Sequence, residues 1–415
     1  MTAISVKTFL GERPKVDPRI LPNESAQIAK GCHFLHGNLT PLNEPLITGD
    51  TVHSGTKTIF KYLNEHWFSW DADVDAVNSP VANDPWQRVY FTGDGYPKVT
   101  TNAIFSGTNM PLGFYRLGVQ APETPIVTAV SETVTADDDP NDDIERYYTH
   151  TYVTEQGEEG APGESSLKVE IKNSEDAGTF VTLGFTPPNV NISNITHRRV
   201  YRTAASADTA DYLHVADVPI SQNIFVDDLF DSNLGSSLET YNYELPPEDM
   251  QGLSSMANGI LAGFTGNTVC FSEAFLAYAW PTDYQMTTEH NIISVVAIGN
   301  SLAVLTEGYP YIFSGSTPES MVGRKLESNQ SCVSKHSSVI VNGAIFYASP
   351  DGIVQLTTDN AVTISESIIT QKQWQAMEPQ TIKAYFQEGK YFALYGQLLN
   401  KGFVIHGEIA RTYAI

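Results

Sequence analysis

The chain has 415 residues, of which 41% are hydrophobic and 11% aromatic, and this apolar content excludes a wholly disordered protein. Asp and Glu number 48 against 24 Lys and Arg, so the net charge of −24 argues against a protein that grips nucleic-acid phosphates or anionic membranes through a broad basic surface. Charged residues make up only 17%, whereas Gly (30) and Pro (23) are plentiful, and this composition favours β structure over helical bundles.

Residues 1–50 are expected to form an extended arm, because prolines recur along them. The segment lacks a basic start followed by a long apolar core, so it does not predict a secretory signal. No run in the chain approaches the ~18 apolar residues of a membrane-spanning helix. These features predict a soluble protein made in the cytoplasm.

The three cysteines, Cys32, Cys270 and Cys332, are too few and too scattered for a disulfide framework. We expect free thiols that are buried or half-buried. Cys32 lies close to His33 and His36, but a structural zinc site needs a fourth ligand and paired spacing, which the sequence does not offer. The sequence therefore predicts neither a metal nor a cofactor.

Two β-hairpins are expected between residues 51 and 119. In the first, the turn Asn64-Glu65 joins Lys57–Leu63 to His66–Trp70, and in the second, Gly93–Gly95 follows Gln87–Thr92. Between them, Asp71–Asp75 has alternating carboxylates. An EF-hand loop would also need Gly at its sixth and Glu at its twelfth position, which this segment lacks, so an acidic surface turn is the better interpretation.

Residues 120–250 differ in composition, since they contain 25 acidic and 6 basic residues and so hold −19 of the net charge. The acidic run Asp137–Asp143 is expected to be a solvated hairpin tip. Tyr147–Thr154 alternates with a period of two, and the spacing of the candidate strands is typical of an immunoglobulin-like or fibronectin-like β-sandwich. The candidate strands are Ile126–Val134, Arg146–Glu155, Ser166–Ile171, Thr179–Phe185, His197–Thr203 and Tyr212–Val218.

Arg198, Arg199 and Arg202 form the one basic cluster in this acidic segment. Ion pairs along a strand edge are the ordinary interpretation of such a cluster. The sharper hypothesis, kept beside it, is that the three arginines are interface residues that contact a partner.

Residues 251–415 contain an internal repeat. Turns recur at Asn258-Gly259, Gly299-Asn300, Asn342-Gly343 and Glu388-Gly389, with steps of 42, 42 and 46 residues between the positions Asn258, Asn300, Asn342 and Glu388. Each turn joins two short strands, and a third strand often follows. A period near 42 built from three or four strands indicates a propeller blade. A β-sandwich with similarly spaced hairpins is the alternative.

The sequence thus predicts an all-β protein with a β-propeller-like body and an inserted immunoglobulin/fibronectin-like β-sandwich. Its parts are an N-terminal arm at 1–50, a first propeller-like part at 51–119, the acidic sandwich at 120–250 and a second propeller-like part at 251–415. The blades on either side of the insertion are expected to close one ring.

Signatures of catalysis are missing from the sequence. It contains neither Gly-x-Ser-x-Gly nor the phosphate-binding Gly-x-x-x-x-Gly-Lys, and the 10 histidines are scattered. Gly93–Gly95 and Ser349–Gly352 are ordinary hairpin turns, because the Asp-containing turns of sialidase-type propellers need a different spacing and a Trp. A pair of glycosidase carboxylates need only meet in space, so the sequence cannot select one among 48 acidic residues. We expect a protein that is not an enzyme.

Several segments together resemble a family of bacteriophage tail nozzle or hub proteins, the tail tubular-type structural proteins of short-tailed phages. The resemblance covers about residues 11–396, and no single motif in it is diagnostic. It rests on Gln251–Leu253, Leu261–Phe264, Gly266–Glu273, Ala279–Pro281, Cys332–Lys335 and Tyr347–Val354, with Tyr152–Glu159 and Arg198–Thr203 in the insertion.

The resemblance implies a virion protein that forms a ring, usually a homohexamer, around the DNA exit channel of the tail. It implies contacts with adaptor or portal proteins on one side and with tail fibre or plug proteins on the other, while viral DNA passes through without specific binding. The segment Ala410–Ile415 ends earlier than many relatives do, which leaves the number of blades open.

Two other functions stay open. A carbohydrate-binding or carbohydrate-cleaving β-propeller, such as a receptor-binding protein, would need clustered aromatic residues and, for cleavage, paired carboxylates at the propeller axis. An adhesin-like module with an immunoglobulin-type arm would be expected to carry a secretion signal.

Overall fold

The structure is a computed structural model, and it describes the chain except residues 1–6, 34–36, 42–53, 65, 106–110, 112, 132–143, 172–179, 189–191, 205–210, 400, 407–408 and 415. Antiparallel strands are the main secondary structure of the described residues. The one α-helix among these residues is the short α1 (Gln371–Ala376). The prediction of an all-β protein is confirmed. No helix in the described part of the chain has both the length and the apolar character that crossing a membrane requires.

The chain divides into two compact units. One contains residues 1–56, 251–269 and 286–415, and the other contains 57–250 and 270–285. Each unit is therefore assembled from segments that are distant in sequence. The closure of one ring by blades on either side of the insertion, and the domain boundaries at 50, 119 and 250, stay predictions.

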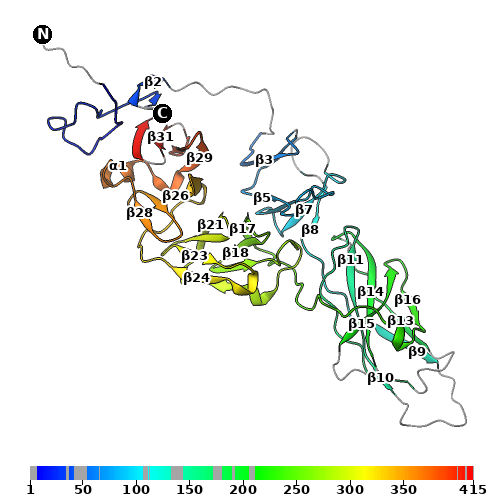
Figure 1. Cartoon of the computed structure of the whole chain (residues 1–415). Coiled ribbons are helices and arrows are strands. Elements are labelled where there is room, and N and C mark those ends of the chain that lie inside the picture. Colours follow the sequence, from blue (N-terminus) through cyan, green and yellow to red (C-terminus); the bar gives the residue numbers. More distant parts are fainter. Residues whose placement is uncertain are drawn as a thin grey trace, which may run out of the picture. The chain divides into compact units, whose positions relative to one another are not determined.

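Four antiparallel sheets of four strands follow one another from residue 251 onward, each with its strands in sequence order (Figure 1). The first has β17 (Gln251–Ser255), β18 (Leu261–Thr265), β19 (Thr268–Phe271) and β20 (Met286–Thr287). The second has β21 (Ile292–Ile298), β22 (Ser301–Thr306), β23 (Tyr311–Ser314) and β24 (Val322–Lys325). The third has β25 (Val339–Val341), β26 (Ala344–Ala348), β27 (Ile353–Leu356) and β28 (Ala361–Thr363), and the fourth has β29 (Lys383–Gln387), β30 (Lys390–Tyr395), β31 (Lys401–His406) and β32 (Ile409–Ala414).

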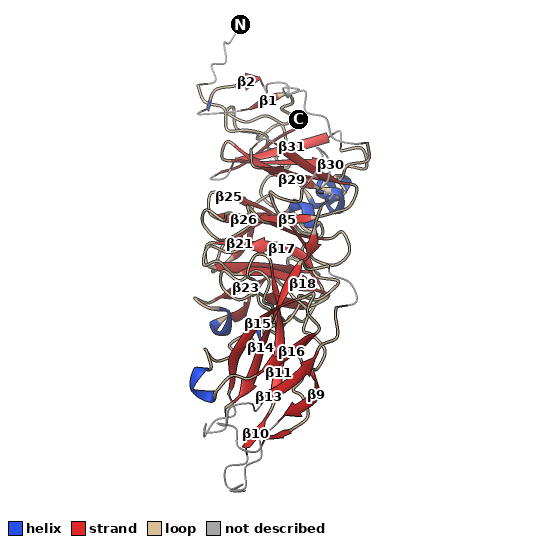
Figure 2. Ribbon diagram, turned by 90° about the vertical axis from the view of Figure 1, so that its right-hand side faces the viewer, coloured by secondary structure: helices blue, strands red, loops and turns tan. Residues whose placement is uncertain are grey.

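Successive sheets pack face to face, and Figure 2 shows them as layers. The first strands of neighbouring sheets lie together, because β17 contacts β21, β21 contacts β25, and β25 contacts β29. Between the second and third sheets, Leu305 packs with Tyr347 in one buried cluster, and between the third and fourth, Phe346 packs with Tyr391 in another. The third sheet is thus apolar on both faces and buries them against its two neighbours. This arrangement is a β-propeller-like body, as the repeat predicts.

The turns between the first two strands of these sheets explain the repeat. Asn342 and Gly343 have φ of +49° and +80° and join Val341 to Ala344 as a two-residue loop, which matches the twist of the strands. Gly299 has a positive φ in the equivalent loop between β21 and β22, and Gly389 in that between β29 and β30. Asn-Gly and related pairs recur because only such residues adopt this backbone at little cost.

The N-terminal arm packs on the fourth sheet of the same unit. Phe9 and Ala29 join Val404 and Phe392 in one apolar cluster, and the Lys15 N–H donates to the Ile368 carbonyl oxygen at 3.1 Å. Within the arm and its surroundings, β1 (Cys32–His33) pairs with β2 (Thr40–Pro41). The arm is therefore not a free extension, because it covers part of an apolar sheet face.

The second unit begins with the predicted hairpin. Strands β3 (Thr58–Tyr62) and β4 (His66–Trp70) pair, and a four-stranded sheet follows, made of β5 (Asp75–Asn78), β6 (Val89–Thr92), β7 (Lys98–Thr100) and β8 (Tyr115–Arg116). The aromatic residues Tyr62, Phe68, Trp70 and Phe91 are buried together in this part. In the segment before β5, Asp71 and Asp73 are exposed, whereas Val74 is buried and Asp75 is the first residue of the strand.

The acidic insertion is a β-sandwich. One sheet has the order β11 (Tyr148–Thr154), β14 (Ile195–Thr203), β15 (Tyr212–Pro219), and the other has β16 (Ile224–Asp227), β13 (Phe180–Gly184), β9 (Ile126–Ser131). A small sheet of β10 (Ile144–Arg146) and β12 (Val169–Ile171) adds Ile171 to the shared core, in which Tyr148, Leu183 and Val200 are fully buried. An immunoglobulin-like or fibronectin-like topology for this sandwich stays a prediction. The tip Asp137–Asp143 lies outside the described residues.

Candidate functional site

Arg202, one of the predicted interface residues, lies inside the sandwich. Its Nε is 2.9 Å from Asp227 Oδ2, and neither side chain has any exposed surface. Arg202 Nη1 is 2.5 Å from Asp231 Oδ1, and Tyr148 donates its hydroxyl proton to Asp227 Oδ2 at 2.7 Å. A buried guanidinium needs such partners, because burying an uncompensated charge costs several kcal/mol. Arg202 therefore links β14 to Asp227 at the end of β16 and to Asp231 in the segment that follows.

Arg198 is also fully buried, but its described hydrogen bonds run to neutral groups. Its Nη1 donates to the carbonyl oxygens of Ile220 at 3.1 Å and Gln222 at 2.7 Å, and the guanidinium lies 5.0 Å from the centre of the Phe185 ring. Burial lowers the pKa of Arg198. The same environment, together with the charge of Arg198, lowers the pKa of the neighbouring buried His150 to about 3.

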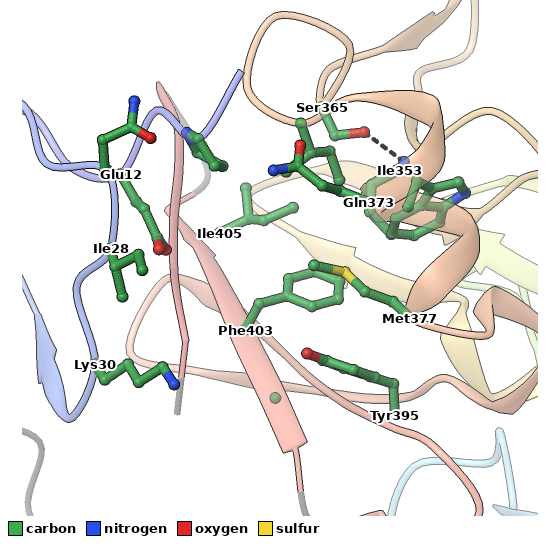
Figure 3. A pocket seen from close by; sticks show the side chains of 15 residues that line it. Glu12, Ile28, Lys30, Ile353, Ser365, Gln373, Met377, Tyr395, Phe403 and Ile405 are labelled. Atoms are coloured by element: carbon green, nitrogen blue, oxygen red, sulfur yellow. Dashed lines mark hydrogen bonds between the residues drawn. The ribbon is translucent and has the colours of Figure 1, made fainter. Parts of the chain in front are cut away.

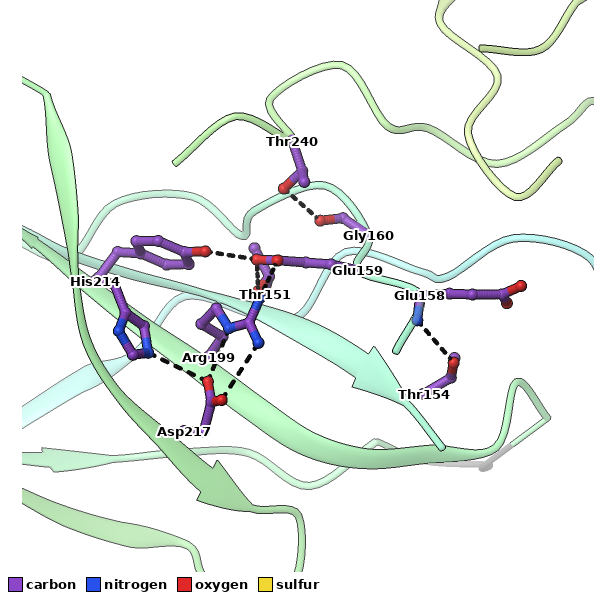
Figure 4. A network of polar contacts seen from close by, with 10 residues as sticks. Thr151, Thr154, Glu158, Glu159, Gly160, Arg199, His214, Asp217 and Thr240 are labelled. Carbon is purple, nitrogen blue, oxygen red and sulfur yellow. Dashed lines mark hydrogen bonds and ion pairs between the residues drawn. The ribbon is translucent and has the colours of Figure 1, made fainter. Parts of the chain in front are cut away.

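Arg199 points to the opposite face of β14 and stays partly exposed (Figure 4). Its Nη1 is 2.6 Å from Glu159 Oε2 and its Nε is 2.8 Å from Asp217 Oδ1. The hydrogen bond from Arg199 lowers the pKa of Asp217. His214 Nε2 lies 3.2 Å from the same Asp217 oxygen.

Glu159 is held from several sides at once. Besides the guanidinium, its Oε1 accepts hydrogen bonds from the Thr151 and Tyr201 hydroxyls, both at 2.7 Å. These three donors occupy acceptor sites on both oxygens of the buried carboxylate and fix its position. The network of Figure 4 thus holds the segment that contains Glu159 against β11 and β14.

These positions correct the hypothesis that all three arginines face a partner. Arg198 and Arg202 contact residues of their own sandwich, and only Arg199 reaches the surface, where two carboxylates already bind it. The alternative interpretation, ion pairing, is the one that the geometry supports for Arg199 and Arg202.

The remaining described cations of the sandwich are paired as well. Arg146 Nη2 is 2.9 Å from Asp231 Oδ1, and Lys168 Nζ is 2.8 Å from both Glu145 and Glu170. Each cation in this part of the structure is therefore neutralised or buried, while acidic residues outnumber basic ones 25 to 6 over 120–250. The surface of the sandwich is negative.

A cavity of about 240 Å³ lies in the other unit, between the arm and the fourth sheet. Phe403 and Tyr395 are among its walls (Figure 3). Trp374 also lines the cavity, and the Phe403 ring lies 6.2 Å from that of Trp374 and 6.1 Å from that of Tyr395. The Trp374 indole N–H donates to the Ser349 carbonyl oxygen at 2.9 Å, so this wall is fixed in place. Its apolar character suits an aliphatic or aromatic group.

The charged groups of the cavity come from the arm, namely Glu12 and Lys30. The charge of Glu12, added to burial, raises the pKa of Tyr395. Among the described residues of the lining, Glu12 is the one carboxylate, whereas glycoside cleavage uses a pair. The cavity can hold an apolar group.

The cysteines are free thiols, as expected. Burial raises the pKa of both Cys270 and Cys332 to about 12, so neither is a ready nucleophile. The candidate group around Cys32 includes His36, which lies outside the described residues, as does the side chain of His33. Within the described part of the chain, no group of three or more His, Cys, Asp or Glu could hold a metal ion.

Comparisons with known proteins place the chain in no established family. No family model matches it, and neither does any curated protein. Among solved structures, Hsv2 of Kluyvelomyces marxianus aligns with 8% identity and a TM-score of 0.28 over 56% of this chain and 60% of its own. BamB of Moraxella catarrhalis aligns with 10% identity and a TM-score of 0.27, over 46% and 58% respectively.

Virginiamycin B lyase of Staphylococcus aureus aligns over 83% of this chain and 89% of its own length. The sequence identity is 10% and the TM-score is 0.29. The chain thus spans less than two thirds of Hsv2 and of BamB. At TM-scores near 0.3 these likenesses carry no argument about activity or partners. The class of protein defined by the described sheets is a β-propeller-like protein with an acidic β-sandwich.

Proposed function

We propose that this protein is a non-enzymatic structural component of a phage tail, a nozzle or hub that forms a ring around the DNA exit channel in the virion. In this proposal it docks to adaptor or portal proteins and to tail fibre or plug proteins, and DNA passes without specific binding. The resemblance described above motivates the proposal, and the propeller-like body with an attached sandwich is compatible with it.

The main support for this proposal is the excess negative charge on the surface of the sandwich. The described cations of the sandwich make contacts within it, such as those of Arg202 with Asp227 and of Arg199 with Glu159, so its excess carboxylates dominate the described surface. A wall of this sign repels phosphates, and DNA can move past it without the many attractive contacts that would stall it.

Negative-stain electron microscopy of the concentrated, purified protein tests the ring. We expect annular particles of about six subunits with a central hole, by the resemblance to nozzle proteins. Single particles of 45.5 kDa that also fail to assemble on a purified portal–adaptor complex would contradict the proposal.

A carbohydrate-binding propeller is the second candidate, and the aromatic cavity favours it. Sugars stack on aromatic rings, and Trp374, Tyr395 and Phe403 meet in that cavity. A glycan array with the full chain tests it. Binding that Phe403→Ala abolishes, with the fold intact, would support this function over the first.

A further inference from the structure

The chain segment that leads from β8 to β9, and so from the sheet of β5–β8 into the sandwich, is buried. It contains Val119, which packs with Tyr152 of β11 and Ile195 of β14 in one apolar cluster. Domains that are joined by short segments usually move relative to each other unless the interface between them is well packed. The burial of Val119 therefore bears on how freely the sandwich can move.

Two glycines of the sandwich let this segment approach closely. A Cβ at Gly160 would lie 2.5 Å from the Val119 carbonyl oxygen, and a Cβ at Gly163 would lie 2.6 Å from that of Pro122. A side chain does not fit at either position unless the backbone moves. The backbone of the joining segment is thus in direct contact with the sandwich.

A buried ion pair connects the same two parts, close in sequence to Gly160. Arg88 precedes β6, Glu158 follows β11, and Arg88 Nη1 lies 2.6 Å from Glu158 Oε1. Arg88 Nε lies 2.7 Å from Asp84 Oδ2, and the three side chains are between 4% and 14% exposed. A small rotation of the sandwich would lengthen the contact with Glu158 before water could replace it, and buried charges without a partner are costly.

Two further contacts start from Arg116 of β8. Its backbone N–H donates to the Ile192 carbonyl oxygen, in the sandwich, at 2.8 Å. Its Nη2 lies 3.1 Å from Glu248 Oε1, but that carboxylate is 78% exposed, so this ion pair is a weak one. The strong ionic contact between the β5–β8 sheet and the sandwich is therefore the one made by Arg88.

We call the Arg88–Glu158 pair and the buried segment 119–122, with the residues that they contact, the joint. We propose that the joint is a rigid coupling, which makes the sandwich and the sheet of β5–β8 move as one body. Arg88 is its positioning residue, because the guanidinium fixes the turn after β11 against the start of β6. A partner that binds the sandwich then turns the sheet with it. The coupling belongs to the single chain, so it does not depend on the proposed ring.

The distance between two spin labels in the full chain tests the coupling. The labels are attached at Asn78→Cys on β5 and Val226→Cys on β16, two exposed positions on strands, in a Cys32→Ser background. Cys270 and Cys332 are buried and stay in place. We expect one narrow distance distribution from double electron–electron resonance. A broad or multiple distribution would overturn the proposal.

Arg88→Met removes the cation of the joint and should broaden the distance distribution, because Glu158 then lacks its partner. The matched control is Arg116→Met, the same substitution in the pair whose carboxylate, Glu248, is exposed, and it should leave the distribution unchanged. Equal widths in the two variants would overturn the role of Arg88 as a positioning residue.

Hydrogen exchange in the wild-type chain gives a readout that needs no substitution. The Arg116 amide donates across the joint to Ile192, so a rigid coupling predicts that it is protected from exchange. Exchange at the rate of an unprotected amide would contradict the proposal. Both measurements use the free chain, so a failure to form rings in electron microscopy rejects the nozzle and leaves the coupling intact, whereas rings with a broad label distribution do the reverse.

Discussion

At the level of single residues, the sandwich contains buried ionic groups whose removal is costly. Arg202 and Asp227 form a pair from which solvent is excluded, and a third partner, Tyr148, completes it. Removing one member leaves the other charged and buried. The pair is therefore costly to break, although it is not a large source of stability by itself.

We expect Arg202→Met to lower the free energy of unfolding by about 3–5 kcal/mol, because Asp227 would then be a buried, unpaired carboxylate. The double variant Arg202→Met/Asp227→Asn should lose less than the sum of the single variants. Urea unfolding measures both effects. Arg199→Met, at a partly exposed position, is the control and should cost about 0–1 kcal/mol.

His150 makes the sandwich sensitive to acid. Its pKa lies near 3 in the folded chain, because of burial and of Arg198, and near 6.5 when unfolded. Between these values the unfolded state binds a proton that the folded state does not, so stability decreases as the pH falls from about 6.5 towards 3.

Replacing the imidazole with an amide in His150→Gln removes this titration. The difference in unfolding free energy between variant and wild type should shift in favour of the variant below pH 6.5, by at most about 1.4 kcal/mol per pH unit. Urea midpoints at neutral and acidic pH give the comparison. A difference that does not vary with pH would show that His150 is not the titrating group.

Among the elements, the hairpin turns explain how a weak sequence repeat becomes a regular stack of sheets. Asn342 and Gly343 both adopt left-handed backbone conformations, and a Cβ at Gly343 would meet nothing within 4 Å. A substitution there acts through backbone strain rather than through a clash.

Gly343→Val should destabilise the protein by about 1–2 kcal/mol, the cost of a side chain in the left-handed region, which is highest for β-branched residues. Gly343→Asn should cost less, because Asn tolerates this conformation. Thermal unfolding of both variants measures the difference. Similar midpoints for Val and Asn would contradict the assignment of the turn.

Neither helix α1 nor the docking of the N-terminal arm was predicted from the sequence. The helix begins at a capping box, in which the Thr370 N–H donates to Gln373 Oε1 at 2.8 Å and the Gln373 N–H donates to Thr370 Oγ1 at 3.3 Å. Thr-x-x-Gln was visible in the sequence as a signal of a helix start. The docking of the arm had no such signal, because its contacts with Ile368 and Val404 span more than 350 residues of chain.

For the whole molecule, the acidic balance predicts weak interaction with DNA. With a net charge of −24 and paired cations in the sandwich, the protein should not shift double-stranded DNA in a gel even at ~50 mM salt, where backbone contacts are strongest. Retention that falls steeply with salt would reveal a basic groove. It would contradict passage of DNA without specific binding.

Pattern and composition alone determined the all-β class, the blade period and most strands of the sandwich. Tyr212–Val218 was expected and Tyr212–Pro219 is observed, whereas the short strand Ile224–Asp227 was not expected. Strands with strong alternation and tight turns are specified locally, by β propensity and by the few residues that permit a positive φ.

Only the tertiary structure decided the roles of the three arginines. Alternation along β14 places Arg198, Val200 and Arg202 on one face and Arg199 on the other, which the sequence already implied. Which face is buried, and which carboxylates meet the arginines, depended on the pairing of β14 with β11 and β15 and on Asp227, 25 residues further along. Local propensity is encoded in neighbouring residues, whereas burial and charge pairing arise from segments that meet only when the chain packs.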